Sequence, residues 1–133
     1  MQEVRVVIPR DPQTSWLAFI DVSNLVAWVP GLTRAQTITM SRGLPGEVHF
    51  EFGTHAYTLV YSYDVAAREV RWHPKIGALG GVSGFAQFQA APDGGTLVTY
   101  GIAQGVARTD AESKLGDPQI LMTAFAAWLT ARS

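Results

Sequence analysis

Three ionisable side chains alternate along one short segment and form a candidate acid–base cluster. Glu47, His49 and Glu51 stand at every second position, so in a strand they share one face. An imidazole held between two carboxylates has a raised pKa and could act as a proton-transfer group. This acid–base cluster is therefore where the sequence suggests enzymatic chemistry.

The opposite face of the same segment competes with the acid–base cluster for the core. It carries Val48, Phe50 and Phe52, and only one face of a strand can be buried. Burying these apolar side chains stabilises the fold, whereas burying three ionisable groups costs free energy. We therefore expect the acid–base cluster to face solvent, and we predict no catalytic residue.

Other polar motifs do not fit the usual metal, nucleotide or nucleophile sites. The spacing of the three histidines matches neither a His-Glu-x-x-His helix nor another compact ligand set, and the chain has no cysteine. The glycines between residues 77 and 84 lack the Gly-Lys-Ser/Thr ending of a phosphate loop, so we expect a flexible loop there. No serine has the Gly-x-Ser-x-Gly context of a hydrolase. We expect no metal and no cofactor.

Aromatic side chains at alternate positions form a second candidate site. Four residues share one face of segment 56–64: Tyr57, Leu59, Tyr61 and Tyr63. In segment 68–73, Val70 and Trp72 share a face. Inward-pointing tyrosines would supply stacking surface and an orienting hydroxyl, which suit a planar or aromatic ligand. Ordinary core packing is the alternative interpretation, and Val60 favours the opposite face.

Strand signals dominate the chain after residue 33. Alternating apolar residues and turn-like separators predict strands at 2–8, 34–41, 47–53, 56–64, 68–73, 82–91 and 95–105. Their short connections favour an antiparallel meander. In segment 82–91, the sequence leaves open whether Gln87 and Gln89 face the core, or whether the alternating set that contains Phe88 does so.

Helices are predicted near both ends. Asp11-Pro12 starts a first short helix, and Asp21 caps a second that stops at Pro30-Gly31. At the other end, Thr109 and Glu112 fit a capping box for a short turn. The last helix begins at Asp117-Pro118, runs to about Ala131 and carries an apolar stripe at helical spacing: Leu121, Ala124, Phe125 and Trp128.

These elements predict an α+β fold. We expect a seven-stranded curved antiparallel sheet around a C-terminal helix, with two short helices between strands 1 and 2. Such a sheet can leave a hollow between itself and the helix. The 133 residues are 47% hydrophobic and show no linker or repeat, which indicates a single domain over residues 1–133.

The low content of charged residues, the near-neutral net charge and the lack of cysteine indicate which partners and which cellular location to expect. Only 16% of the residues are charged, compared with about 25% in typical domains. The net charge of −1 argues against nucleic-acid binding. No apolar run approaches the roughly 20 residues that span a membrane, and no signal peptide is evident. The lack of cysteine fits a cytoplasmic location.

Four features occur in a recognisable order along the chain. They are Asp21-Val22-Ser23-Asn24-Leu25 followed by Trp28-Val29-Pro30-Gly31, a hairpin from Tyr63-Asp64 to Val70-Arg71-Trp72, a hairpin from Phe85 to Gly95-Thr96 with Val98 and Tyr100, and the terminal helix. Together they resemble START-like (SRPBCC, helix-grip) proteins, in particular the polyketide cyclase/dehydrase and lipid-transport branch. The last helix of that family is usually long and continuous. Here Gly116-Asp117-Pro118 should break it and leave about 14 residues.

The resemblance implies a cavity between the sheet and the C-terminal helix that binds a hydrophobic or aromatic small molecule, lipid- or polyketide-like. The expected contacts are Phe50, Phe52, Tyr57, Tyr61, Trp72, Leu121, Phe125 and Trp128. One alternative is an aromatase/cyclase or dehydratase that acts on a polyketide-like substrate. Another is a protein-interaction module with an exposed apolar patch and little internal volume. The expected partner is thus a hydrophobic small molecule, without nucleic acid or an integral membrane segment, and the chain is expected to be a monomer or homodimer.

Overall fold

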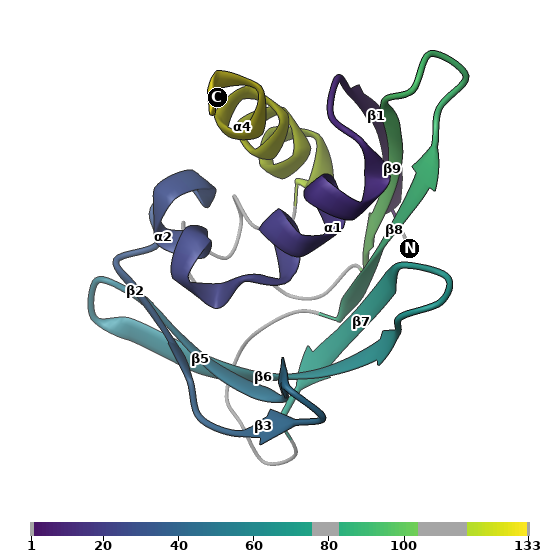
Figure 1. Cartoon of the computed structure of the whole chain (residues 1–133). Coiled ribbons are helices and arrows are strands. Elements are labelled where there is room, and N and C mark those ends of the chain that lie inside the picture. Colours follow the sequence, from purple (N-terminus) through teal and green to yellow (C-terminus); the bar gives the residue numbers. More distant parts are fainter. Residues whose placement is uncertain (1, 76–82, 104–116, 133) are drawn as a thin grey trace.

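A computed structural model describes residues 2–75, 83–103 and 117–132 of the chain (Figure 1). The N-terminal elements are β1 (Gln2–Ile8), α1 (Pro12–Ile20), the 3₁₀ turn η1 (Val22–Asn24) and α2 (Leu25–Trp28). The strands that follow are β2 (Arg34–Thr37), β3 (Met40–Ser41), β4 (Leu44–Pro45), β5 (Glu47–Phe52), β6 (His55–Asp64), β7 (Glu69–Pro74), β8 (Gly84–Ala90) and β9 (Thr96–Ile102). Helix α4 (Pro118–Ala131) is the last element.

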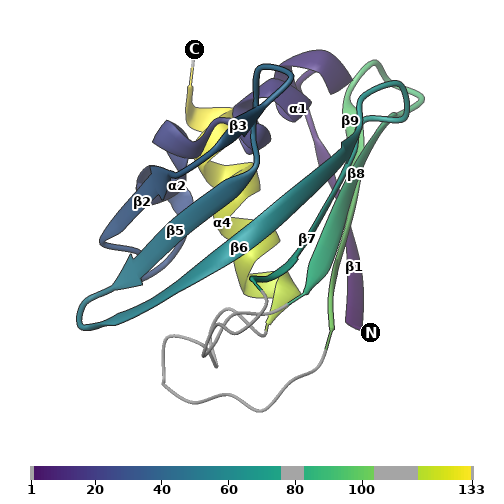
Figure 2. The ribbon, with the colours of Figure 1, turned by 90° about the horizontal axis from the view of Figure 1, so that it is seen from below.

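Seven strands form one antiparallel sheet in the order β1-β9-β8-β7-β6-β5-β2. The strands from β5 to β9 are a meander, as the short turns predict, and β1 closes the order by pairing with β9. The sheet curves, and α1, α2 and α4 lie on its concave side (Figures 1 and 2). The predicted α+β helix-grip architecture is therefore confirmed.

The phases of the central strands follow the burial of apolar area. In β5, Val48, Phe50 and Phe52 are buried, so the acid–base cluster points to the other side of the sheet, as expected. In β8, Ala86 and Phe88 are buried. This settles the question that the sequence left open, because Gln87 and Gln89 must then lie on the convex face.

The prediction of one strand over residues 34–41 is wrong. The backbone amides of Ile38 and Thr39 both donate to the carbonyl of Glu47, at 2.8 and 3.3 Å, so the ladder with β5 ends there. The chain then forms the separate β3–β4 hairpin, whose turn holds Arg42 and Gly43 at positive φ. Segment 42–46, which its two glycines and proline predict to be only a turn, thus contains β4.

Aspartates cap the helices as the sequence predicts. Asp11 accepts a hydrogen bond from the Thr14 amide at 3.0 Å, and Asp21 accepts one from the Ser23 amide at 3.0 Å. Asp117 accepts one from the Gln119 amide at 3.0 Å and starts α4, which has 14 residues. The expected capping box at residues 109–112 and the glycines at 77–81 lie outside the described residues, as does the end of the last predicted strand beyond residue 103.

A cluster of aromatic rings joins the helices to the sheet. Phe19 of α1 is its centre, with ring centroids 5.7 Å from Trp28, 6.2 Å from Trp72, 6.3 Å from Tyr100 and 5.3 Å from Phe125. Phe19 is buried, and Phe125 is fully buried. Helices α1 and α2 therefore insert side chains between α4 and part of the sheet.

Candidate functional site

A cavity of about 50 Å³ lies between the concave face of the sheet and the helices. Of the side chains that the structure describes, those lining it are Phe19, Leu25, Trp28, Val29, Phe50, Phe52, Tyr57, Leu59, Tyr61, Trp72, Tyr100, Ile102 and Leu121. None of these carries a charge, and most are aromatic. The volume holds a few water-sized groups and is smaller than the roughly 150 Å³ of an apolar cavity that binds benzene.

A row of residues across four strands forms one wall of the cavity. Tyr61 of β6 pairs with Trp72 of β7, Trp72 pairs with Gly84 of β8, and Gly84 pairs with Ile102 of β9. A Cβ atom on Gly84 would lie 2.8 Å from Cζ2 of Trp72 and 2.5 Å from the carbonyl oxygen of Gly101. The glycine thus lets the Trp72 indole lie against the sheet toward Tyr100, at a centroid distance of 5.5 Å.

Three polar atoms belong to this otherwise apolar lining. Within the described part of the chain, the indole Nε1 of Trp28 is buried without a hydrogen-bond partner, and the lining also includes the phenols of Tyr61 and Tyr100. Burial raises the pKa of the Tyr61 phenol well above its usual value, and neighbouring tyrosines, Tyr100 first, add to this shift. Burial also raises the pKa of Tyr100. Both phenols therefore stay protonated at neutral pH.

Six of the eight sequence-predicted contacts line the cavity: Phe50, Phe52, Tyr57, Tyr61, Trp72 and Leu121. Phe125 and Trp128 do not. Phe125 packs against Trp28 at 4.9 Å and against Phe19, so the rings of α1 and α2 stand between it and the cavity. Trp128 is half-buried against Phe125 and beneath the Arg132 guanidinium.

Sequence reasoning missed the contribution of the two short helices. The cavity lining includes four residues of this region: Phe19, Leu25, Trp28 and Val29. The sequence pattern indicated only that the short helices have an apolar side and did not show what that side contacts. Tyr100 and Ile102 were missed as well, whereas Leu59 was placed on the candidate face of segment 56–64 but not among the expected contacts. Their alternation in β6 and β9 was the available signal, because residues two apart on a strand share a face.

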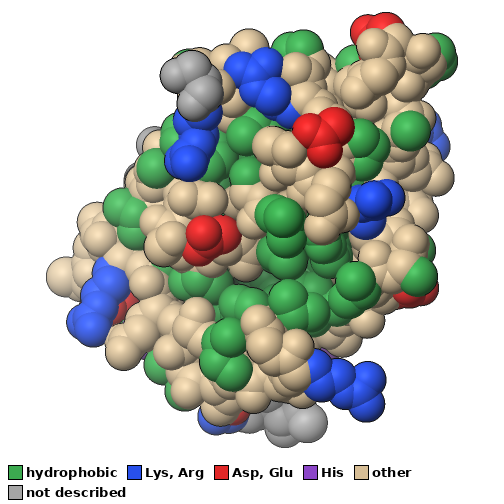
Figure 3. Space-filling view, viewed as in Figure 1, with side chains coloured by type: hydrophobic (Ala, Val, Ile, Leu, Met, Phe, Trp, Pro, Cys, Tyr) green, Lys and Arg blue, Asp and Glu red, His purple; other side chains and the backbone are tan. Residues whose placement is uncertain are grey.

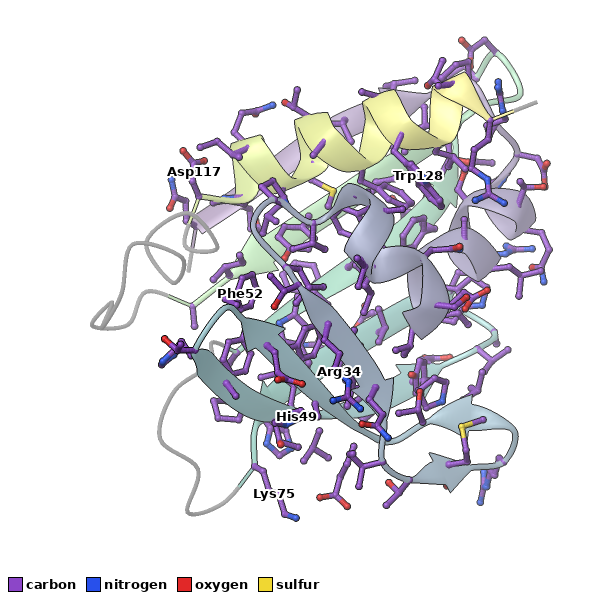
Figure 4. The ribbon with its side chains drawn as sticks, turned by 90° about the vertical axis from the view of Figure 1, so that its left-hand side faces the viewer. Arg34, His49, Phe52, Lys75, Asp117 and Trp128 are labelled. Atoms are coloured by element: carbon purple, nitrogen blue, oxygen red, sulfur yellow. The ribbon has the colours of Figure 1, made fainter. Side chains whose placement is uncertain are left out.

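The alternation in β5 puts the acid–base cluster on the convex face, and Figure 4 shows its member His49 away from α4. Its members form surface ion pairs: Lys75 Nζ is 2.7 Å from Glu47 Oε1, and Arg34 Nη1 is 3.5 Å from Glu51 Oε2. His49 Nε2 is 3.8 Å from the same Glu51 oxygen. In Figure 4, Phe52 and Trp128 lie on the opposite side, between the sheet and α4. The sheet therefore separates the acid–base cluster from the cavity.

A second, open groove of about 690 Å³ lies between the α1–η1 region and the β3–β4 hairpin. Its apolar lining includes Leu17, Ile20, Met40 and Leu44, and the first and third of these are 51% and 59% exposed. In Figure 3, hydrophobic side chains gather in a hollow on this side of the molecule. We call this surface the α1–hairpin groove.

Two negative findings concern only the part of the chain that the structure describes. No group of three or more potential ligands (His, Cys, Asp or Glu) is placed to hold a metal ion. No helix there combines the length and the apolar character needed to cross a membrane.

The fold has clear structural relatives, although no family model and no curated protein sequence matches the chain. A START superfamily protein from Mycobacterium smegmatis superposes with a TM-score of 0.78 at 10% identity, covering 99% of this chain and 98% of that one. The Zhui aromatase/cyclase from Streptomyces sp. R1128 superposes with a TM-score of 0.64 at 15% identity, covering 97% and 87%. Ara h 8.0201 gives 0.67 at 16% identity, covering 98% and 97%. The curved sheet, the two short helices α1 and α2, and the final helix α4 thus give the chain the START-like, helix-grip fold.

Proposed function

We propose that this protein binds a small hydrophobic, aromatic molecule in the cavity between its sheet and its helices. The observation that carries the proposal is the lining, in which aromatic and aliphatic side chains surround the space and no described member is charged. Binding would come mainly from burial of apolar surface, at about 25 cal/mol per Å². The proposal is also supported by the fold, which this chain shares with a protein named a START superfamily protein and with one named an aromatase/cyclase.

The volume favours the small end of the hydrophobic ligands. About 50 Å³ is far too small for a lipid chain or a polycyclic polyketide, and a single ring would enter only if the lining side chains moved apart, since a cavity that binds benzene has roughly 150 Å³. Stacked and tilted rings on the wall, such as Phe50 against Tyr57 at 5.5 Å and Tyr61 against Trp72 at 5.9 Å, offer flat faces to a planar ligand.

Native mass spectrometry of the protein purified from its source tests this proposal. We expect a co-purifying small hydrophobic compound with the wild-type chain. Leu121→Trp would fill the cavity from α4 and should abolish retention of the compound. Ile120→Trp is the matched control, because the Ile120 side chain is 45% exposed and lies outside the lining. Equal retention by both variants, or none by the wild type, would contradict the proposal.

The two alternatives have less support. An aromatase/cyclase or dehydratase needs a buried acid or base, and the acid–base cluster lies on the convex face with partly exposed side chains. The interaction module has one favourable observation, the α1–hairpin groove with exposed Leu17 and Met40. The same mass spectra address it, since a retained protein instead of a small compound would favour that function.

A further inference from the structure

We infer that the cavity selects an uncharged single-ring molecule whose ring bears a hydrogen-bond acceptor such as a carbonyl oxygen, held by donors from Tyr61, Tyr100 and Trp28. This inference rests on the proposed function and specifies its ligand class. The acceptor distinguishes the expected ligand from a plain hydrocarbon, and the lack of charge distinguishes it from a fatty or aromatic acid.

The case for an acceptor begins with a buried donor that has no partner, the indole Nε1 of Trp28. Tyr100 and Trp28 are 5% and 6% exposed, and Tyr61 lines the same cavity. Buried polar groups in proteins are nearly always hydrogen-bonded, because an unsatisfied buried donor costs about 1–3 kcal/mol. In the described part of the chain, the Trp28 indole Nε1 is a buried donor without a partner, and Tyr61 and Tyr100 contribute phenols to the lining of the same cavity. A bound acceptor would satisfy the indole and could also accept from a phenol.

The chemistry of the three groups decides which partner fits. An indole N–H can only donate a hydrogen bond, so Trp28 requires an acceptor. Phenols can donate or accept, but Tyr61 and Tyr100 remain protonated because burial raises the pKa of each. The rings of both tyrosines contact Trp72, at 5.9 and 5.5 Å, so they flank one part of the wall. A carbonyl oxygen, with two lone pairs, can accept from more than one of these donors.

The lining also argues against an anion. Transfer of a carboxylate from water into an apolar site is costly unless a cation or several strong hydrogen bonds compensate. The described lining contains no Lys, Arg or His. Neutral donors are better matched to a neutral acceptor, which loses much less hydration on entry.

Three probes of nearly the same shape test the inference. Acetophenone, α-methylstyrene and benzoate each carry a planar three-atom group on one benzene ring, with a carbonyl, a methylene and a carboxylate respectively. Isothermal titration calorimetry with the full chain should show the tightest binding for acetophenone. We expect α-methylstyrene to bind about two- to tenfold more weakly, as one net hydrogen bond predicts, and benzoate more weakly still.

Variants identify the donors. Tyr61→Phe and Tyr100→Phe each remove one hydroxyl and keep the ring, so acetophenone affinity should fall while α-methylstyrene affinity stays the same. Tyr63→Phe is the matched control, because the Tyr63 hydroxyl donates to the Pro45 carbonyl at 2.7 Å and lies outside the lining. The infrared carbonyl stretch of bound acetophenone should move to higher frequency in the two cavity variants and not in the control.

The outcomes separate this inference from the proposed function. Equal affinities of acetophenone and α-methylstyrene, unaffected by the tyrosine variants, would overturn the donor argument and leave hydrophobic binding intact. Tighter binding of benzoate would overturn the preference for a neutral ligand. Failure of all three probes would overturn the single-ring class, and the proposed function would then stand or fall on the native mass spectra.

Discussion

Gly84 offers the sharpest test of how the cavity wall is built. In Gly84→Ala, the new Cβ would meet Cζ2 and Cε2 of Trp72 at 2.8 and 2.9 Å and the carbonyl oxygen of Gly101 at 2.5 Å. The indole ring can tilt, but Gly101 cannot easily move, because β9 pairs with β8 on one side and with β1 on the other. Overpacking of this kind costs about 1–3 kcal/mol.

The contact with backbone places the expected loss near the upper half of that range, at about 2–3 kcal/mol. Urea unfolding should show a lower midpoint with an unchanged slope, because the folded and unfolded states keep their surface areas. In a thermal melt, the same loss corresponds to about 6–12 °C in Tm. Binding of the cavity ligand should weaken as well, since Trp72 lines the cavity.

Two further variants separate the steric argument from a general glycine effect. Gly94 has φ +88°, and a Cβ atom added there would meet no atom within 4 Å. Gly94→Ala should therefore cost only backbone strain, about 1 kcal/mol, without loss of binding. Adding Trp72→Phe to Gly84→Ala removes part of the clash, so the double variant should lose less than the sum of the single losses. Additive losses, or a Gly84→Ala protein as stable as wild type, would refute the reasoning.

Further predictions concern the helix ends and the convex face. Arg10→Ala removes hydrogen bonds from the guanidinium to the carbonyls of Thr130 and Arg132, at 2.7 and 2.8 Å, and should cost about 1 kcal/mol with faster hydrogen exchange in the last turn of α4. Asp117→Ala removes the N-cap of α4 and should cost about 1 kcal/mol in urea unfolding. Hydrogen bonds from Thr14 lower the pKa of Asp11, so its stabilising effect is present above its unfolded-state pKa and is lost as the pH falls through the lowered folded-state pKa. The difference in unfolding free energy between wild type and Asp11→Asn should therefore be larger at neutral pH than in strong acid, and a constant difference would contradict the cap. His49→Ala should change stability by less than about 0.5 kcal/mol and leave ligand binding intact, whereas lost binding would place the acid–base cluster in the function.

The strand phases were predictable because burial decides them. Phe50 and Phe52 outweigh the three ionisable residues of the acid–base cluster, and the sheet adopts that phase. The β3–β4 hairpin was not predictable in the same way. It depends on two amides sharing the Glu47 carbonyl and on Arg42 at positive φ, and no periodic pattern encodes either feature.

The cavity contacts were predictable only where two layers meet directly. Leu121, one of the expected ligand contacts, lines the cavity, but Phe125, one turn further along α4, lies behind Phe19 and Trp28. Helical spacing identifies the apolar face of a helix, but it does not tell which other element covers that face. The tertiary placement of α1 and α2 therefore decided which residues line the cavity.

The pairing of β1 with β9 has a consequence for how the protein folds. Gln2 lies opposite Ile102, and Ile8 lies opposite Thr96, so β1 pairs with a strand that is far from it in the sequence and is synthesised much later. Contacts of such large sequence separation slow folding, because a long loop must close before they form. The apolar residues Val4, Val6 and Ile8 lack their sheet partner until β9 has been synthesised. We expect the nascent chain to depend on chaperone protection until β9 has emerged.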